Sequence, residues 1–515
     1  MLYRPLHLPG LALFALALLL AGCQRKPDPA ATQQESAGPT LRRGLGAPPE
    51  TLDPHMAADN ASLAVLTDLY EGLTTETADG AIEPGAAESW TVSPDGLTWT
   101  FRLRPLLRWS DGETLTAADF VAGLESVTAP QSTAPNGALL EALVGVEAID
   151  SSTLVLHLDR PLPYLPALLA LPVAAPVYRG PGTATPSPGN GPYRLVARRA
   201  DRIELERNPH YRRAASVPAG GVVYRVVEDL TAELNLYRTG ELDLTSEVPN
   251  SQLEWIREHL PGELQVAPYL STYAYAVNLA RLPDAAARQA LAMAVDRERI
   301  TARVTGAGER PAFGWVPDGI PGYVPARFEW SDLPYETAAR QARALWKAAV
   351  ERGTAPARIK LCTDASANHR RTAVALADLW RSALGVETEI VEFEWNVYLD
   401  RRSNPGDCDL VRLGWSADFV DAEAFADVFE TGHPQNTLGY TSDRYDALLQ
   451  ESRVAADAAQ RSRQLAAAES QLLADAPVIP VFFRVSKRLV KPHVEGYRAN
   501  PLGHVASRDL RIDSR

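Results

Sequence analysis

The fold of this chain is decided by residues 359–413, IKLCTDASANHRRTAVALADLWRSALGVETEIVEFEWNVYLDRRSNPGDCDLVRL. Three short apolar runs alternate here with two helical patterns, and the runs cover 359–363, 386–393 and 408–413. The first helical pattern, 369–384, is amphipathic and ends at Gly385, a residue type favoured after a helix C-terminus. The second helical pattern covers 395–402. This β-α-β-α-β order predicts an α/β fold with a largely parallel sheet and helices on its faces.

The rest of the chain changes pattern near residues 71, 188 and 271. Residues 41–70 predict a short strand, a Pro-rich turn and an apolar helix. Short strands and turns follow over 71–187, including a clean apolar–polar alternation over 97–104. Strands return over 188–270, and a helix-rich region with separated strands extends to about residue 483.

The N-terminus is typical of a bacterial lipoprotein signal. Eleven consecutive Ala, Leu and Phe residues cover 11–21, which suits a secretory signal and is too short to cross a ~30 Å hydrocarbon core comfortably. The run closes with Leu20-Ala21-Gly22-Cys23, which resembles the lipobox, where the chain is cut before a cysteine that carries the lipid. We therefore expect removal of residues 1–22 and lipidation of Cys23. A plain cleaved signal followed by a chance cysteine is the alternative.

Residues 23–40 are expected to form a disordered tether. After the cysteine they are rich in Pro, Ala, Gln and Ser and contain no large apolar side chain. No later segment reaches ~18 uncharged apolar residues, so no other segment is expected to span a bilayer. The prediction is a folded body in the periplasm or at the cell exterior, held at a membrane by its N-terminal lipid.

Composition and motifs exclude several classes of protein. The 515 residues carry a net charge of −13, which argues against a nucleic-acid partner because phosphate binding needs a basic face. The chain contains no GxSxG, HExxH, GxxxxGK[ST] or GxGxxG motif, and its nine histidines are scattered without metal-ligand spacing. We therefore expect no enzyme activity, no cofactor and no metal site.

Two cysteines remain after the lipidation site, Cys362 and Cys408. An oxidising compartment permits a disulfide between them. Both are predicted strand residues, however, and a disulfide needs Cα atoms within ~7 Å. We therefore expect two buried, unreactive thiols, with the disulfide as the alternative.

An ordered series of short motifs resembles the bacterial extracytoplasmic solute-binding proteins of the peptide/nickel-binding family, in the oligopeptide-binding branch of ABC importers. The series covers nearly the whole chain from residue 41, and it is specific because the motifs follow one another in the family's order. Its members are Thr51–His55, Asp68–Leu73, Pro84–Trp90, Trp99–Arg104, Trp109–Gly112, Thr116–Val121, Asn190–Tyr193 and Leu205–Pro209.

The resemblance implies a two-lobed periplasmic-binding-protein fold with a hinge and an additional third domain. Lobe I is then discontinuous, the extra domain is inserted in it, and lobe II follows. The segments are 41–70 plus 188–270 plus 484–515 for lobe I, 71–187 for the extra domain and 271–483 for lobe II. The implied function is that of a monomeric, non-enzymatic binding component that captures short peptides and delivers them to the transmembrane subunits of an ABC permease.

The segment from Arg412 to Asp418, RLGWSAD, resembles the family's ligand motif most closely. It follows the predicted strand 408–413, and ligands of α/β sheets bind beyond such strand ends. By resemblance, Asp418 binds the peptide's α-ammonium group, Trp415 forms a wall of a side-chain pocket, and Gly414 and Ser416 complete the motif. The alternative for Asp418 is a solvated loop carboxylate.

For the peptide's carboxylate, the resemblance points to cationic residues, since the guanidinium fork binds carboxylates bidentately. The candidates are His369, Arg402 and Arg412, and further pocket walls are Trp395 and Leu399. The alternative for His369 is an exposed surface residue, and that for Arg402 and Arg412 is an ordinary salt bridge. The alternative for Trp395 and Leu399 is core packing.

Several positions depart from the family's pattern and leave the ligand's length open. A lysine is expected near Thr305, an acid near Ala58 (Asp59 is adjacent) and an aromatic residue at Ala274. A cysteine pair is expected at the positions of Ser271 and Ser416. Alternatives to free peptides are murein peptides, nickel complexes or haem on the same fold, a secreted hydrolase using Asp418, and a binder without a transporter.

Overall fold

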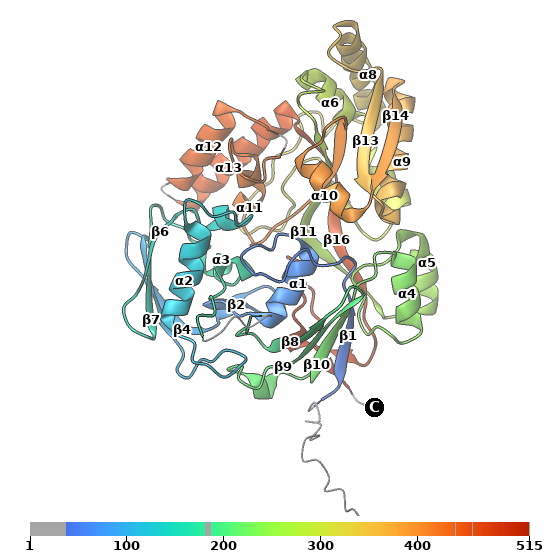
Figure 1. Ribbon diagram of the computed structural model, residues 1–515. Helices are drawn as coiled ribbons and strands as arrows, with labels where there is room; N and C mark the ends of the chain where they lie inside the picture. The colour runs from blue at the N-terminus through green and yellow to red at the C-terminus, as the bar shows by residue number, and fades with distance from the viewer. Residues whose placement is uncertain (1–37, 181–186, 438, 456, 514–515) are drawn as a thin grey trace, which may run out of the picture. The chain divides into compact units, whose positions relative to one another are not determined.

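The computed structural model describes residues 38–180, 187–437, 439–455 and 457–513 (Figure 1). The predicted signal peptide, Cys23 and the predicted tether up to residue 37 lie outside these residues. Thr40, the last residue assigned to the tether, opens the first strand. Within the described ranges, no helix combines the length and the apolar character that a membrane crossing requires.

One four-stranded sheet brings distant segments of the chain together. Its order is β1-β10-β9-β8, and the strands are β1 (Thr40–Gly44), β8 (Tyr193–Arg198), β9 (Arg202–Arg207) and β10 (Gly221–Arg225). β1 pairs in parallel with β10, and the other pairs are antiparallel. Segments 41–70 and 188–270 therefore share a sheet. The accompanying helices are α1 (Asn60–Leu69), α4 (Leu230–Arg238) and α5 (Leu253–His259).

A second four-stranded sheet lies within 71–187 and is entirely antiparallel, with the order β4-β5-β7-β6. Its strands are β4 (Ala87–Val92), β5 (Thr98–Leu103), β6 (Leu143–Ala148) and β7 (Thr153–Leu158). The strand predicted from the alternation over 97–104 is confirmed, since Trp99, Phe101 and Leu103 are buried in β5. Also in this region are β2 (Thr74–Glu76), β3 (Ile82–Pro84), α2 (Ala117–Thr128) and α3 (Leu165–Leu168).

The sheet predicted from residues 359–413 has six strands in the order β12-β16-β11-β15-β13-β14. The strands are β11 (Leu264–Val277), β12 (Arg310–Pro311), β13 (Arg358–Asp364), β14 (Glu387–Phe393), β15 (Leu410–Ser416) and β16 (Val478–Leu489). β13 pairs in parallel with β14 and β15, as predicted. The prediction of a largely parallel sheet is wrong for the other half, because β11, β12 and β16 enter from remote segments and pair antiparallel.

Helices pack beside this sheet, and α9 lies along β13 and β14 (Figure 1). Its predicted end is confirmed, because Gly385 takes the left-handed conformation with φ of 75°. The helices of residues 271–483 are α6 (Ala285–Met293), α7 (Arg297–Ile300), α8 (Tyr335–Glu351), α9 (Ala367–Leu384), α10 (Trp395–Ser403), α11 (Glu423–Ala426), α12 (Asp443–Arg453) and α13 (Ala458–Asp475), of which α11 and α12 pack on α13. The short strands β17 (Val494–Glu495) and β18 (Arg511–Ile512) pair near the C-terminus.

β11 and β16 run through two of the positions where the sequence changes pattern. β11 begins at Leu264, before residue 271, and β16 ends at Leu489, after residue 483. The two strands pair with each other over most of their length, with register shifts between Pro268 and Thr272 and between Tyr273 and Ala274. Two paired strands therefore connect the regions on either side of these positions.

The expectation of two free thiols is wrong, because Cys362 and Cys408 form a disulfide with a Cα–Cα distance of 5.9 Å. Cys362 lies in β13, and Cys408 lies just before β15. β13 and β15 are neighbours in the sheet although β14 comes between them in the sequence. Adjacent parallel strands bring the two Cα atoms within bonding range, which the order of elements along the chain does not reveal.

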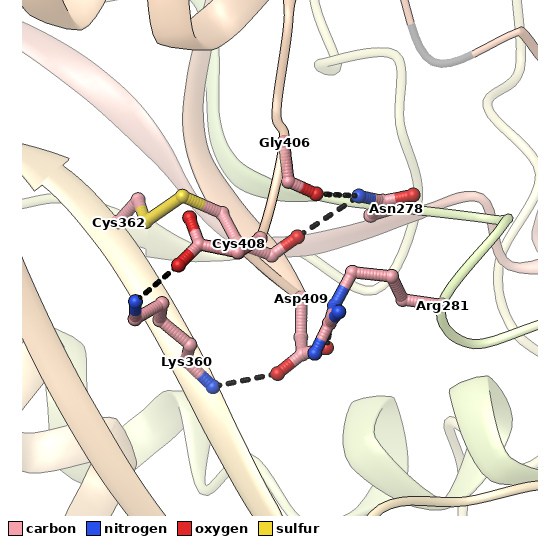
Figure 2. The surroundings of a disulfide bond; sticks show 8 residues. Asn278, Arg281, Lys360, Cys362, Gly406, Cys408 and Asp409 are labelled. Atoms are coloured by element: carbon pink, nitrogen blue, oxygen red, sulfur yellow. Dashed lines mark hydrogen bonds and ion pairs between the residues drawn. A yellow bond between two sulfur atoms is a disulfide. The ribbon is translucent and has the colours of Figure 1, made fainter.

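Figure 2 shows the contacts around this disulfide that hold the residues leading into β15. Asp409 accepts hydrogen bonds from the backbone N–H of Lys360 at 2.7 Å and from Nε of Arg281 at 2.6 Å. The side-chain amide of Asn278 donates to the carbonyls of Cys408 and Gly406. Covalent and polar contacts therefore hold the start of β15 against its neighbours.

We predict that replacing both disulfide cysteines with serine lowers the free energy of unfolding by ~2–4 kcal/mol. The crosslink closes a loop with a sequence separation of 46, which restricts the unfolded chain. Urea unfolding measures the change, and dithiothreitol should shift the midpoint of the unaltered protein but not that of the double variant. Equal midpoints for both proteins without reductant would contradict the prediction.

Candidate ligand-binding site

A buried carboxylate, Asp364, gathers two of the predicted site residues. Asp364 is the last residue of β13, and its Oδ1 accepts a hydrogen bond from Nε of Arg412 at 3.0 Å. The same oxygen lies 2.8 Å from Nδ1 of His369. Arg412 lies in the middle of β15 and His369 in the first turn of α9. A strand end, a neighbouring strand and a helix start therefore converge on one carboxylate.

The charges of this group follow from burial and pairing. Burial opposes the ionisation of Asp364, but the charge of Arg412 and the hydrogen bond from His369 hold its pKa well below the usual range. Burial, together with repulsion from Arg412, lowers the pKa of His369. At pH 7 the imidazole is therefore neutral and donates its Nδ1 hydrogen to Asp364, so the positive charge of the group lies on Arg412.

Aromatic rings hold this group in place. Cζ of Arg412 lies 4.8 Å from the centre of the Tyr398 ring, and the Tyr398 hydroxyl donates to the Arg412 carbonyl at 2.6 Å. The His369 ring lies 5.4 Å from the ring of Tyr273. Burial opposes the charge of Arg412, but the negative charge of Asp364 raises its pKa, so the guanidinium stays charged. The structure thus places Arg412 and His369, two of the residues predicted to bind the peptide's carboxylate, next to each other.

Helix α10 supplies the other predicted residues of this end. Trp395 and Leu399 are half-buried and pack against the cluster that contains the disulfide and Tyr398. The guanidinium of Arg402 makes no hydrogen bond or ion pair with another residue in the described part of the chain. Burial lowers its pKa, and Arg412 adds repulsion. A second positive charge therefore lies near Arg412, and the carboxylate of Glu50 acts on it without forming an ion pair.

Asp418 lies beyond the opposite end of β15. Its carboxylate is half-buried and receives no hydrogen bond or ion pair from the residues that the structure describes. Burial raises its pKa to about 6, although His504 opposes this shift. A recessed and unpaired carboxylate is costly to keep ionised, so a cation from outside would stabilise it.

The residues between these two ends are fixed by side-chain hydrogen bonds. Nε1 of Trp415 donates to the Ala424 carbonyl at 2.6 Å. Oγ of Ser416 accepts from the Tyr269 hydroxyl at 2.6 Å and lies 3.0 Å from Oγ of Ser271. Two hydroxyls thus meet where the resemblance had led us to look for a cysteine pair.

One edge of β15 is left without a strand partner next to these residues. β13 pairs with β15 only at Leu410 and Val411, whereas β11 pairs with β15 as far as Ser416. Within the described residues, no strand covers the other edge over 412–416. The backbone groups of such an edge can pair with an extended chain.

Sequence analysis did not identify two of the residues that matter here. Asp364 directly follows the predicted strand 359–363, so its place at a strand end beside 408–413 was the available signal. Arg484, on β16, also lies close to Gly414. The run around Arg484 predicts only a strand, and the strand's place in the sheet was not predictable from it.

The comparisons with known proteins agree with this architecture. Residues 81–437 match the family described as bacterial extracellular solute-binding proteins, family 5 Middle. The periplasmic oligopeptide-binding protein OppA of Escherichia coli is 33% identical over 505 residues, which cover 92% of each chain. The resemblance drawn from the motifs is therefore confirmed at the level of the family.

Solved structures confirm the predicted α/β fold of the periplasmic binding proteins. Haemophilus influenzae OppA in complex with RPPGFSPFR superposes with a TM-score of 0.87 at 31% identity, over 93% of this chain and 99% of that one. The murein tripeptide-binding protein MppA of Escherichia coli gives 0.88 at 30% identity, over 92% and 99%. The unliganded open form of MppA gives only 0.69 over 92% and 98%. The structure thus differs more from that open form than from the other MppA structure.

We predict that Asp364→Asn lowers the free energy of unfolding by ~3–5 kcal/mol, since it leaves the charge of Arg412 buried without a counter-ion. Urea unfolding measures the loss. Asp407→Asn is the matched control, because Asp407 forms an exposed ion pair with Lys360 in the same region, and it should have little effect. Similar unfolding midpoints for the two variants would show that Asp364 does not neutralise a buried charge.

Proposed function

The chain belongs to the bacterial extracellular solute-binding proteins of family 5, which are binding proteins and not enzymes, and on that premise we propose that it captures short oligopeptides outside the cytoplasm for import by an ABC transporter. The alternative of a hydrolase is set aside because the family consists of solute-binding proteins. Relatives that bind peptides, as their names and titles say, support a peptide ligand.

The observation that carries this proposal is the distribution of charge along β15. Arg412 provides a positive charge within the strand, and Asp418, which has no ion-pair partner among the described residues, follows its far end. No described strand pairs with the edge between them. A peptide in solution has a positive amino end and a negative carboxyl end. An extended peptide on this edge would place its two charges against opposite charges, with main-chain hydrogen bonds that do not depend on its side chains.

The separation of these two residues limits the ligand's length. Asp418 is six positions after Arg412, so their Cα atoms can be at most ~20 Å apart, even with the backbone fully extended. An extended peptide covers that distance with about six residues. A ligand held at both ends would therefore be short.

A murein peptide is the second candidate ligand. The chain superposes with MppA, which binds a murein tripeptide, as well as it does with OppA. A murein peptide also offers an ammonium group to Asp418 and carboxylates to the cationic end. Native mass spectrometry of the protein purified without added ligand distinguishes the two, because the masses released on denaturation identify the bound species.

Binding is proposed to close two lobes by a hinge. The proposed lobe I consists of 41–70, 188–270 and 484–515, the extra domain of 71–187, and lobe II of 271–483. β11 and β16 connect lobe I with lobe II and are the candidate hinge strands. The two structures of MppA, to which this chain is unequally similar, support more than one arrangement for a chain of this fold.

The body is proposed to be a monomer that delivers its ligand to the transmembrane subunits of the permease while anchored by a lipid on Cys23. We predict that Cys23→Ser yields protein that is unlipidated and that leaves the membrane fraction or keeps residues 1–22. Detergent partitioning and intact-mass measurement test this. A Cys23→Ser protein of mature size that still partitions with membranes would contradict the anchor.

We predict that Asp418→Asn weakens peptide binding by a few hundred-fold or more, because it removes one partner of a desolvated charge pair. N-acetylation of the peptide should cause a similar loss with the unaltered protein, since it removes the α-ammonium charge. The two losses should not add. Calorimetry on the four combinations measures this, and equal binding of free and acetylated peptide by the unaltered protein would refute the role of Asp418.

The pH dependence provides a control for this assignment. The pKa of Asp418 is about 6, and only the ionised carboxylate pairs with an ammonium group. The affinity of the unaltered protein should therefore be highest near pH 7 and fall roughly tenfold per pH unit below pH 6, with a second fall above about pH 8 as the peptide's α-ammonium group deprotonates. Asp418→Asn should lack the fall below pH 6.

A further inference from the structure

One pocket beside the six-stranded sheet contains a charged side chain that forms no ion pair with the residues that the structure describes. Its lining includes Tyr273, Thr305, His369, Arg484 and Lys487. Nζ of Lys487 lies 3.1 Å from the carboxylate of Glu309, and the other polar residues of the lining also have hydrogen-bond partners. Arg484 makes no hydrogen bond or ion pair with any residue of the described ranges.

The surrounding backbone directs Arg484 toward the binding strand. Phe483 pairs with Thr272 and Val485 with Pro268, so residues 269–271 of β11 all face Arg484. Such a bulge changes the direction of the side chains around it. Cζ of Arg484 lies 5.8 Å from the centre of the Tyr269 ring, whose hydroxyl is bonded to Ser416 of β15. Arg484 is thus held next to the motif that precedes Asp418.

Gly414 provides the space between Arg484 and Arg412. A Cβ atom at Gly414 would lie 3.0 Å from Nη1 of Arg412 and 3.8 Å from Nη1 of Arg484. The two guanidinium groups therefore flank the same point on β15, and the absence of a side chain at Gly414 leaves that point open. Arg412 uses its Nε for Asp364, whereas no carboxylate in the described part of the chain is paired with Arg484.

We propose that Arg484 binds a carboxylate of the ligand together with Arg412, across Gly414. This assignment rests on the proposed function, and it adds a residue and a specificity to it: ligands that place a carboxylate at this point are preferred. The carboxylate is either the peptide's terminal group or an acidic side chain.

The chemistry favours an anion with two oxygens. Two guanidinium groups that face one point repel each other, and a carboxylate between them would relieve the repulsion while accepting a hydrogen bond from each. Glu247 does not fill this role, because its Oε1 lies 3.5 Å from Nζ of Lys487. Burial opposes the ionisation of Glu247, and Lys487 and then Arg484 lower its pKa, so the charge of Arg484 is felt there without an ion pair.

The test compares Arg484→Gln with the unaltered protein by calorimetry, using tripeptides to pentapeptides as free acids and as C-terminal amides. Arg484→Gln should weaken binding of the acids about ten- to a hundredfold and that of the amides less than threefold. Arg484→Lys should restore part of the affinity, because it keeps the charge. Arg310→Gln is the control, since Arg310 is an exposed arginine over Phe483 of the same strand, and it should change neither.

A second arm identifies the source of the carboxylate. Amidated peptides with Glu or Gln at each position in turn carry the acid only on the side chain. If Arg484→Gln loses affinity only for the Glu peptides, the site binds an acidic side chain. If it loses affinity only for the free acids, the site binds the peptide's terminal carboxylate.

The outcomes separate this assignment from the proposed function. If Arg484→Gln prefers acidic peptides as strongly as the unaltered protein does in both arms, the role of Arg484 is overturned. Peptide capture as the proposed function would still stand. Failure of the unaltered protein to bind any peptide of the set would overturn the proposed function and the role of Arg484 with it.

Discussion

The proposed binding site depends on β11, because both of its edges are occupied by strands that carry the proposed binding residues. β15 pairs along one edge and positions Arg412 and Gly414, and β16 pairs along the other and positions Arg484. Buried backbone N–H and C=O groups must find hydrogen-bond partners, so these pairings fix the register. A slip by one residue would turn every side chain of a strand to the opposite face, which would separate the two guanidinium groups.

Burial of charge then determines what the site can bind. A guanidinium as deeply buried as that of Arg412 needs a counter-ion, and Asp364 provides it through Nε. Asp364 is a single carboxylate and neutralises only Arg412. Arg402 and Arg484 add positive charge around the same strand, and neither forms an ion pair among the described residues. At the other end, Asp418 forms no ion pair with the described residues, and His504 only partly offsets the effect of its burial. The strand thus presents charges of opposite sign at its two ends, which is complementary to a zwitterionic chain and unfavourable for a uniformly charged one.

The sequence predicted what depends on neighbours along the chain. The strands around 359–413, the helix end at Gly385 and the place of the ligand motif after a strand all follow from local periodicity and from residue types. It did not predict what depends on the order of strands within the sheet. The disulfide of Cys362 with Cys408, the antiparallel half of the sheet and the position of Arg484 all arise where segments far apart in the sequence become neighbours.

The position of the disulfide has a consequence for how β15 responds to a ligand. The disulfide of Cys408 links the start of β15 to β13. The Asp409 carboxylate accepts hydrogen bonds from Arg281 and from the backbone N–H of Lys360. At the other end, Ser271 pairs with Ser416 in the strand ladder, their hydroxyls are hydrogen-bonded, and the Ala417 N–H donates to the Leu270 carbonyl at 2.9 Å. The start of the strand therefore keeps its place, and with it the pairing of Arg412. Because the ladder holds the far end as well, the separation of Arg412 and Asp418 is set by the sheet, and a ligand that binds both residues must match it.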